Sequence, residues 1–103
     1  MYLEWSAFAR ADRTTIFDYI EADNPRAAVA IDERIGTSVA GLAQFPEMGR
    51  PGRIEGTRGL VISGTPYIAA YRIDGETVRI LRVLHGAQQW PAEIVEEPDE
   101  RSR

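Results

Sequence analysis

The strongest constraint on the fold is an Asp-Gly dipeptide, Asp74-Gly75, that separates two strand-like runs. Residues 67–73 and 76–84 are both rich in β-branched and aromatic side chains. Two such runs joined by Asp-Gly are a strong short-range signal for a β-hairpin. We therefore expect the stretch 64–91 to form a hairpin at the centre of a small sheet.

Antiparallel pairing of the two runs also predicts which side chains share a face of the hairpin. The first face is expected to carry Tyr67, Ala69, Tyr71, Ile73, Val78, Ile80, Arg82 and Leu84. The second face is expected to carry Ile68, Ala70, Arg72, Thr77, Arg79, Leu81, Val83 and His85. Both faces are apolar with arginines among them, so either one could pack against helices while the other presents charge.

Two helices are expected to precede this hairpin. Ser6 is a suitable N-cap for a helix that runs to about residue 22. Asn24-Pro25 then combines a capping side chain with a proline at the first helical position, which predicts a second helix that ends before residue 46. Because only a couple of residues separate them, the two helices should form an antiparallel pair.

The remaining segments complete an α+β domain. Residues 2–5 read as a short first strand, residues 47–59 as a loop with four glycines and a proline, and residues 60–63 as another short strand. This order predicts a helical hairpin packed on a small antiparallel sheet of three to four strands. We expect residues 1–91 to form one domain and residues 92–103 to be an acidic tail whose composition favours disorder.

The composition excludes several kinds of site. Cysteine is absent and histidine occurs once, so a disulfide, a thiolate nucleophile and a zinc site are not expected. We accordingly expect no metal and no other cofactor. No apolar run approaches membrane length, and the N-terminus lacks the basic start and apolar core of a signal peptide. The chain is therefore expected to be soluble and cytoplasmic, without a membrane partner.

The formal net charge of −4 conceals an uneven distribution of charge. Between residues 50 and 90 the chain holds Arg50, Arg53, Arg58, Arg72, Arg79 and Arg82 against Glu55, Asp74 and Glu76. All twelve cations are arginine. A GC-rich genome would produce this bias, but the planar guanidinium group also suits phosphate or carboxylate partners.

His85 is the first candidate for chemistry, at the end of the last predicted strand. Its side chain could act as a general base, or it could cap the strand end by hydrogen bonds. Arg72 and Arg79, expected on the same face, could stabilise a phosphate in a ribonuclease reaction. Alternatively, these two arginines form cross-strand salt bridges with nearby acids.

A second group of candidates could bind a partner without catalysis. The glycine-rich loop holds Arg50, Arg53 and Arg58, which could cradle phosphate or simply be solvated. The aromatic residues Tyr67, Tyr71 and Trp90 could stack on bases, or they could fill the core.

Several motifs together resemble the RelE/ParE superfamily of toxins from type II toxin-antitoxin pairs. They are Asn24-Pro25 with Ala27-Ala28, Phe45-Pro46-x-Met48-Gly49-Arg50-Pro51-Gly52-Arg53, Gly56-Thr57-Arg58, Tyr67, Tyr71-Arg72, and Val78-x-Ile80-Leu81-Arg82-Val83-Leu84-His85-Gly86. The similarity covers about residues 2–91. The fold of this superfamily, a helical hairpin on a small antiparallel sheet, agrees with the order of elements derived above.

The resemblance implies two mechanisms. RelE-like members are ribosome-dependent mRNA endoribonucleases, for which His85 would be the acid or base and Arg58, Arg72, Arg79 or Arg82 would hold the phosphate. ParE-like members poison DNA gyrase. Residues 65–71 contain no cation where the ribonucleases carry an arginine, and the chain has no lysine. The resemblance therefore favours the ParE-like branch, while an inactive toxin-like binding module stays open as a third alternative.

Either mechanism implies a cognate antitoxin as a partner, besides DNA gyrase or the ribosome and its mRNA as the target. A flexible segment of the antitoxin would cover the basic sheet or the helical hairpin, and toxin and antitoxin would form a hetero-oligomer. The residues expected to bind target or antitoxin are Arg50, Arg53, Arg58, Tyr67, Tyr71 and Trp90.

Overall fold

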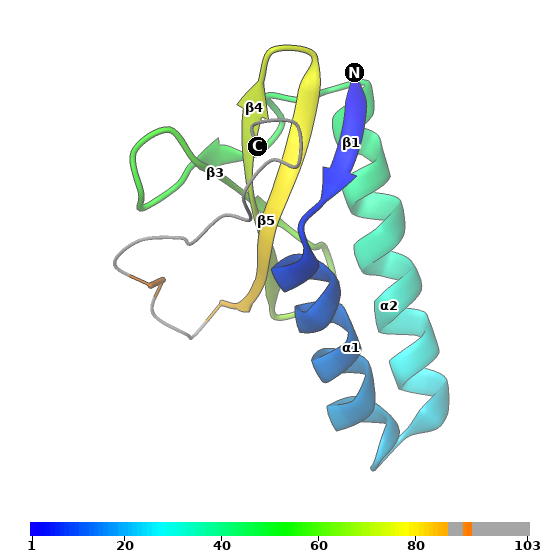
Figure 1. Ribbon diagram of the computed structural model, residues 1–103. Helices are drawn as coiled ribbons and strands as arrows, with labels where there is room; N and C mark the ends of the chain where they lie inside the picture. Colours follow the sequence, from blue (N-terminus) through cyan, green and yellow to red (C-terminus); the bar gives the residue numbers. More distant parts are fainter. Residues whose placement is uncertain (87–89, 92–103) are drawn as a thin grey trace.

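The structure is a computed structural model that describes residues 1–86, 90 and 91. It contains a five-stranded sheet with two helices packed on one face (Figure 1). The elements are β1 (Tyr2–Trp5), α1 (Ala7–Glu21), α2 (Pro25–Ala40), the 3-10 turn η1 (Gly41–Ala43), β2 (Arg50–Pro51), β3 (Arg58–Val61), β4 (Tyr67–Asp74) and β5 (Thr77–His85). The strand order is β1-β5-β4-β3-β2. The α+β class and the central hairpin are confirmed, whereas the acidic tail lies outside the described residues.

The sheet has more strands than expected, and it is not entirely antiparallel. β1 pairs with β5 in parallel, with Tyr2 opposite Thr77 and Trp5 opposite Ile80. Parallel neighbours need a long crossover connection, which here consists of both helices and the strands β2 to β4. The fifth strand, β2, is only two residues long and pairs with β3, so its sequence carries no strand signal of its own.

Both helices begin where their capping residues predict. The Ser6 side chain accepts a hydrogen bond from the Ala9 amide at 2.9 Å, and the Asn24 side chain accepts one from the Ala27 amide at 3.1 Å. Each bond satisfies an amide that the first turn of a helix would otherwise leave without an acceptor. These local contacts confirm the two predicted helix starts.

The helices are held together by Arg13 as well as by apolar packing. The Nε of Arg13 donates to Asp32 of α2 at 2.9 Å, and its guanidinium lies 4.8 Å from the centre of the Trp5 ring. A side chain added at Gly36 would lie 3.3 Å from the same guanidinium. The glycine therefore leaves room for Arg13 between the two helices.

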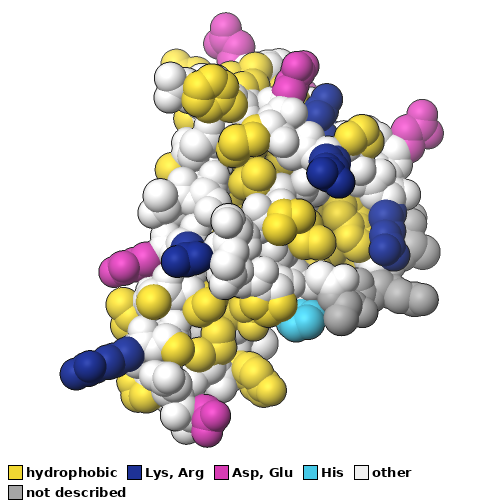
Figure 2. Space-filling view, turned by 180° about the vertical axis from the view of Figure 1, so that it is seen from behind, with side chains coloured by type: hydrophobic (Ala, Val, Ile, Leu, Met, Phe, Trp, Pro, Cys, Tyr) yellow, Lys and Arg dark blue, Asp and Glu magenta, His cyan; other side chains and the backbone are white. Residues whose placement is uncertain are grey.

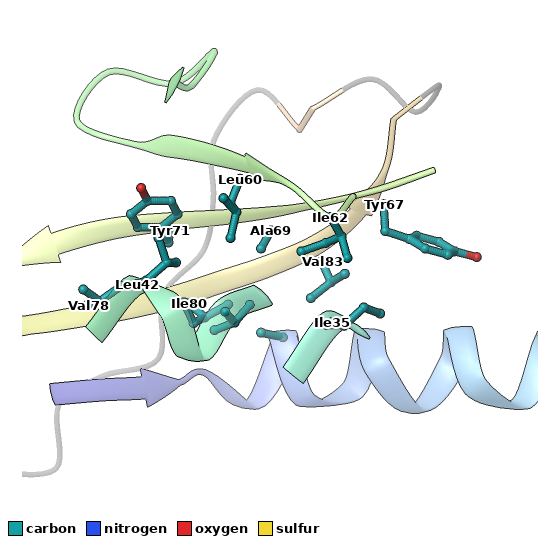
Figure 3. Close-up of a cluster of buried hydrophobic side chains, with 12 residues drawn as sticks. Ile35, Leu42, Leu60, Ile62, Tyr67, Ala69, Tyr71, Val78, Ile80 and Val83 are labelled. Carbon is teal, nitrogen blue, oxygen red and sulfur yellow. The ribbon is translucent and has the colours of Figure 1, made fainter. Parts of the chain in front are cut away.

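The core lies between the helices and one face of the sheet (Figure 3). Its fully buried side chains include Ile35 and Val39 of α2, Leu42 of η1, Tyr71 of β4 and Ile80 of β5. Burying one such aliphatic side chain contributes roughly 1.5–3 kcal/mol. Because the helices bury this face, we call the opposite face of β4 and β5 the open face, although Ala70 and Leu84 on it are also buried.

A β-bulge in β5 changes the predicted faces of the hairpin. Ala70 pairs with Arg82, whereas the next residue of β4, Tyr71, pairs with Ile80. Leu81 is therefore an extra residue in β5, and every residue after it turns to the opposite face. The prediction was wrong for the end of the strand: Val83 and His85 share the helix-covered face with Tyr67, and Arg82 and Leu84 belong with Arg72 and Arg79.

Candidate functional site

The open face carries a row of charged side chains across three strands. Arg72 and Arg79 are direct cross-strand partners, and Arg79 in turn lies opposite Glu4 of β1. The Nε of Arg79 lies 3.5 Å from a carboxylate oxygen of Glu4. Like charges placed directly opposite each other destabilise a strand pair. The carboxylate of Glu4 offsets part of this repulsion.

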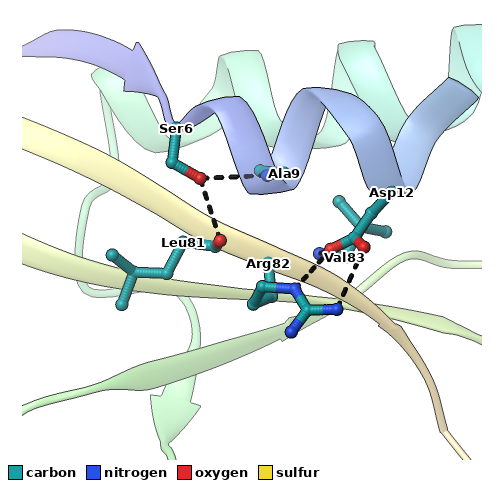
Figure 4. Close-up of polar contacts among 6 residues, drawn as sticks. All are labelled: Ser6, Ala9, Asp12, Leu81, Arg82 and Val83. Atoms are coloured by element: carbon teal, nitrogen blue, oxygen red, sulfur yellow. Dashed lines mark hydrogen bonds and ion pairs between the residues drawn. The ribbon is translucent and has the colours of Figure 1, made fainter. Parts of the chain in front are cut away.

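Arg82 forms an ion pair with Asp12 of α1 at the edge of the sheet. Its Nε and Nη2 donate to the two carboxylate oxygens of Asp12 at 2.8 and 3.1 Å (Figure 4). One of these oxygens also accepts a hydrogen bond from the Val83 amide at 2.8 Å. The hydrogen bond to Asp12 raises the pKa of Arg82, which therefore stays cationic. The pair fixes α1 against β5, so the contact of Arg82 is structural.

Where β1 ends, Ser6 donates hydrogen bonds to backbone carbonyls on the same edge of β5. The Ser6 amide donates to the carbonyl of Ile80 at 3.0 Å, and its hydroxyl donates to the carbonyl of Leu81 at 2.9 Å. Backbone groups left open at a sheet edge would otherwise need water or another chain. The start of α1 thus takes over from β1 as the neighbour of β5.

The buried side chain of Tyr71 anchors the loop between η1 and β2 by hydrogen bonds. Its side chain is 0 % exposed, and its hydroxyl donates to the carbonyl of Pro46 at 2.7 Å and accepts from the Gly49 amide at 2.9 Å. Burial raises the pKa of Tyr71 above its usual value. Since the ring is enclosed, Tyr71 acts on this loop rather than by direct stacking on a partner.

Arg58 holds the same loop from its other side. Its Nη1 donates to the carbonyl of Gly49 at 2.8 Å and lies 3.4 Å from that of Glu47. A Cβ at Gly49 would lie 2.6 Å from the Tyr71 hydroxyl oxygen, so only glycine fits under these contacts. Three residues that the sequence analysis treated separately, Arg58, Tyr71 and Gly49, therefore form one anchor.

His85 lies on the opposite side of the sheet from the arginine pair. It is exposed, and its ring meets that of Tyr67 edge-on, with the ring centres 5.6 Å apart and the planes at 86°. Tyr67 is 8 % exposed, and burial raises its pKa. Because of the bulge, the structure does not bring His85 together with Arg72 and Arg79 on one face.

The remaining candidates lie around β2 and β3. Arg50 and Arg53 are exposed. Trp90 is partly buried, and a Cβ added at Gly52 or at Gly59 would lie 2.9 or 3.3 Å from its ring. Trp90 therefore packs against the backbone of these two glycines. Figure 2 shows apolar side chains with arginines set among them on the side that faces away in Figure 1, where the histidine also lies.

Sequence reasoning missed Asp12 and the anchoring role of Tyr71. Asp12 is one of several acids on α1, and no spacing pointed to a partner 70 residues away. The Pro46–Gly49 segment was noted as part of a motif, but its hydrogen bonds to a buried tyrosine have no local signal. Both contacts depend on how α1 and β4 meet distant parts of the chain.

Two further properties of the described part of the chain bear on function. Within residues 1–86, 90 and 91, no group of three or more histidine and acidic side chains could hold a metal ion. Neither of the described helices combines the length and apolar character needed to cross a membrane.

Comparison with known proteins gives a consistent set of relatives. Residues 3–90 match the family model of the ParE toxin of the type II toxin-antitoxin system parDE. The chain is 48 % identical over 89 residues to Y4kP of Sinorhizobium fredii, a protein named as a toxin, covering 86 % of this chain and 92 % of that protein. It is 37 % identical over 84 residues to toxin RelE2 of Caulobacter vibrioides, covering 82 % and 93 %.

Two solved structures share the fold. A chain of the chromosomal ParDE toxin-antitoxin system from P. aeruginosa superposes with a TM-score of 0.76 at 30 % identity. A chain of the toxin-antitoxin complex RelBE2 from Mycobacterium tuberculosis superposes with a TM-score of 0.57 at 32 % identity. Each match covers 82 % of this chain and 95 % of the other.

Proposed function

The chain belongs to the ParE toxin family of type II toxin-antitoxin systems, and on this premise we propose that it inhibits growth by poisoning DNA gyrase. A cognate antitoxin neutralises it, and the two proteins form a hetero-oligomer in the cytoplasm. The observation that carries the gyrase assignment is the closer structural likeness to the ParDE system than to the RelBE2 complex. The two matches cover the same share of the chain at similar sequence identity. The difference between their TM-scores therefore reflects the backbone structure and not the sequence.

The positions of the arginines support this choice. Arg82 is paired with Asp12, and Arg58 is bonded to loop carbonyls, so both guanidinium groups already serve the fold. His85 lies on the face opposite Arg72 and Arg79. General acid-base chemistry on RNA requires an acid or base and cationic groups around one phosphate. In this structure His85 and the two arginines are not positioned around one common point.

The open face is the surface that we assign to the antitoxin. Arg72 and Arg79 face each other there, with Glu4 beside one of them, and further cations at Arg50 and Arg53 are exposed near β2. An acidic extended segment would complement the positive charge of these arginines. Both structural relatives come from toxin-antitoxin systems, which supports such a partner.

Expression without antitoxin tests the proposed function. We expect growth arrest with filamentation and induction of the DNA damage response, and the purified protein should inhibit supercoiling by purified DNA gyrase. Co-expression of the small antitoxin from the neighbouring reading frame should restore growth. Arrest of translation with cleaved transcripts and unaffected gyrase would overturn the gyrase assignment, and normal growth would favour an inactive binding module.

A RelE-like ribonuclease is the second candidate, because the chain also matches toxin RelE2 and its single histidine is exposed. In that case His85 acts as acid or base beside Tyr67. His85→Ala should then abolish cleavage of ribosome-bound mRNA while the far-UV circular dichroism spectrum stays unchanged. If gyrase poisoning is correct, the same variant should inhibit gyrase as the wild type does.

A further inference from the structure

We propose that the loop between η1 and β2 is the surface that contacts gyrase, and that it receives an apolar and a basic side chain from one segment of that enzyme. This inference rests on the proposed function and adds a surface and a partner chemistry to it. We call residues 44–48 the target loop. They line an open depression of about 490 Å³.

The target loop exposes large apolar side chains. Phe45 is 59 % exposed and Met48 is 51 % exposed, and both line the same depression with Pro46. Aromatic residues and methionine are enriched in the centres of protein interfaces, where a few buried anchors supply most of the binding energy. Two such side chains beside a depression form a suitable anchor site.

The loop is also held in place before any partner arrives. The carbonyl of Pro46 accepts a hydrogen bond from Tyr71, and Gly49, the residue that follows the loop, is bonded to both Tyr71 and Arg58. The Phe45 amide donates to the carbonyl of Gly41 in η1 at 2.9 Å, and within the loop the Met48 amide donates to the carbonyl of Phe45 at 3.1 Å. A surface that is already ordered loses little conformational entropy on binding. The buried hydroxyl of Tyr71 thus supports a loop whose own side chains point outward.

The charge of the loop specifies the kind of partner. Glu47 is the charged side chain that lines the depression, and it is exposed, whereas the Arg58 guanidinium is bonded to the carbonyls of Glu47 and Gly49. A carboxylate beside apolar walls favours a segment with an apolar side chain next to a lysine or arginine. It disfavours an acidic segment, because like charges brought together are repelled.

This chemistry separates the target from the antitoxin. Arg72 and Arg79 on the open face suit an acidic segment, whereas the target loop suits a basic and apolar one. The two surfaces also lie on different sides of the sheet, since the loop is reached by Tyr71 from the helix-covered face. A partner bound at one surface therefore does not need contacts with the other surface.

The test uses the full-length protein and purified DNA gyrase in a supercoiling assay. The variants are the double substitution Phe45→Ser with Met48→Ser, and the charge reversal Glu47→Arg, which changes an exposed side chain. We expect each to raise the concentration for half-inhibition of gyrase by about tenfold or more, as for truncated interface anchors. Val29→Ser on α2 is the matched control, because Val29 is similarly exposed at 49 % but lies outside the loop. It should inhibit as the wild type does.

Binding to the purified antitoxin is measured in parallel, with circular dichroism to confirm that each variant is folded. We expect the affinity for antitoxin to change by less than about twofold, because exposed substitutions away from an interface have small effects. Undiminished gyrase inhibition by both the double variant and Glu47→Arg would overturn the inference, as would loss of antitoxin binding with inhibition retained. If the wild type itself leaves gyrase active, the proposed function fails first, and the assignment of the loop falls with it.

Discussion

Asp12 of α1 and Arg82 of β5 form an ion pair with two hydrogen bonds, of 2.8 and 3.1 Å, between residues 70 positions apart in the sequence. The same carboxylate accepts the Val83 amide, so one side chain joins a helix both to a guanidinium group and to the backbone of a strand. This contact lies just beyond the bulge at Leu81, where β5 no longer has β1 as its neighbour. Asp12 therefore protects the sheet edge and fixes the helix on it.

Asp12→Ala should destabilise the fold. The substitution removes the acceptor of three hydrogen bonds and leaves the Val83 amide without it, so we expect the free energy of unfolding to fall by about 2 kcal/mol. Chemical denaturation with urea measures the change. Asp18→Ala, an exposed acid on the same helix, is the control and should cost less than about 0.5 kcal/mol. Equal effects of the two substitutions would show that the ion pair contributes no net stability.

Tyr71→Phe should loosen the target loop with little change to the core. The ring remains, but the hydroxyl that bonds Pro46 and Gly49 is lost, and a buried amide is left without its acceptor. We expect the free energy of unfolding to fall by about 1–3 kcal/mol. Hydrogen exchange of the Gly49 amide should become faster, while the amides of α2 keep their protection relative to global unfolding. Unchanged exchange at Gly49 would contradict the anchoring role.

The buried tyrosines should make the protein less stable in alkali. Burial raises the pKa of Tyr71 and of Tyr67 in the folded state, so the unfolded chain loses these protons first. Their contribution is therefore fully present below the unfolded pKa of about 10 and is lost as the pH rises through the folded pKa. Urea denaturation at several pH values should show a decline above about pH 10 that is shallower in Tyr71→Phe. An identical slope in the two proteins would contradict the assignment to Tyr71.

Gly49→Ala should be destabilising for a steric reason. The new methyl group would lie 2.6 Å from the Tyr71 hydroxyl oxygen and 2.9 Å from the carbonyl oxygen of Gly59, so the loop must move. We expect a loss of about 1–3 kcal/mol, as for other forced insertions into packed sites. Gly41→Ala is a suitable comparison, because its methyl group would meet only Met48, at an ordinary 3.7 Å. Thermal unfolding of the two variants tests the difference, and similar melting temperatures would contradict the steric argument.

Local chemistry made much of the fold predictable from the sequence. The side chains of Ser6 and Asn24 accept hydrogen bonds from amides three residues ahead. Gly75, with its positive φ, lies in the two-residue turn that follows Asp74, one residue later than the dipeptide predicted. Each signal and its structural effect therefore lie within a few residues. The candidate arginines and His85 could be named for the same reason, since their residue types are visible in the sequence. Their partners could not be named.

Only the tertiary structure decided which of these side chains act together. The parallel pairing of β1 with β5, the bulge at Leu81, the Asp12–Arg82 pair and the bond of Tyr71 to the target loop all join segments far apart in the chain. Such contacts are chosen by the packing of the helices on the sheet, which no short pattern encodes. A single extra residue in β5 was enough to place His85 and the paired arginines on opposite faces, because side chains alternate along a strand.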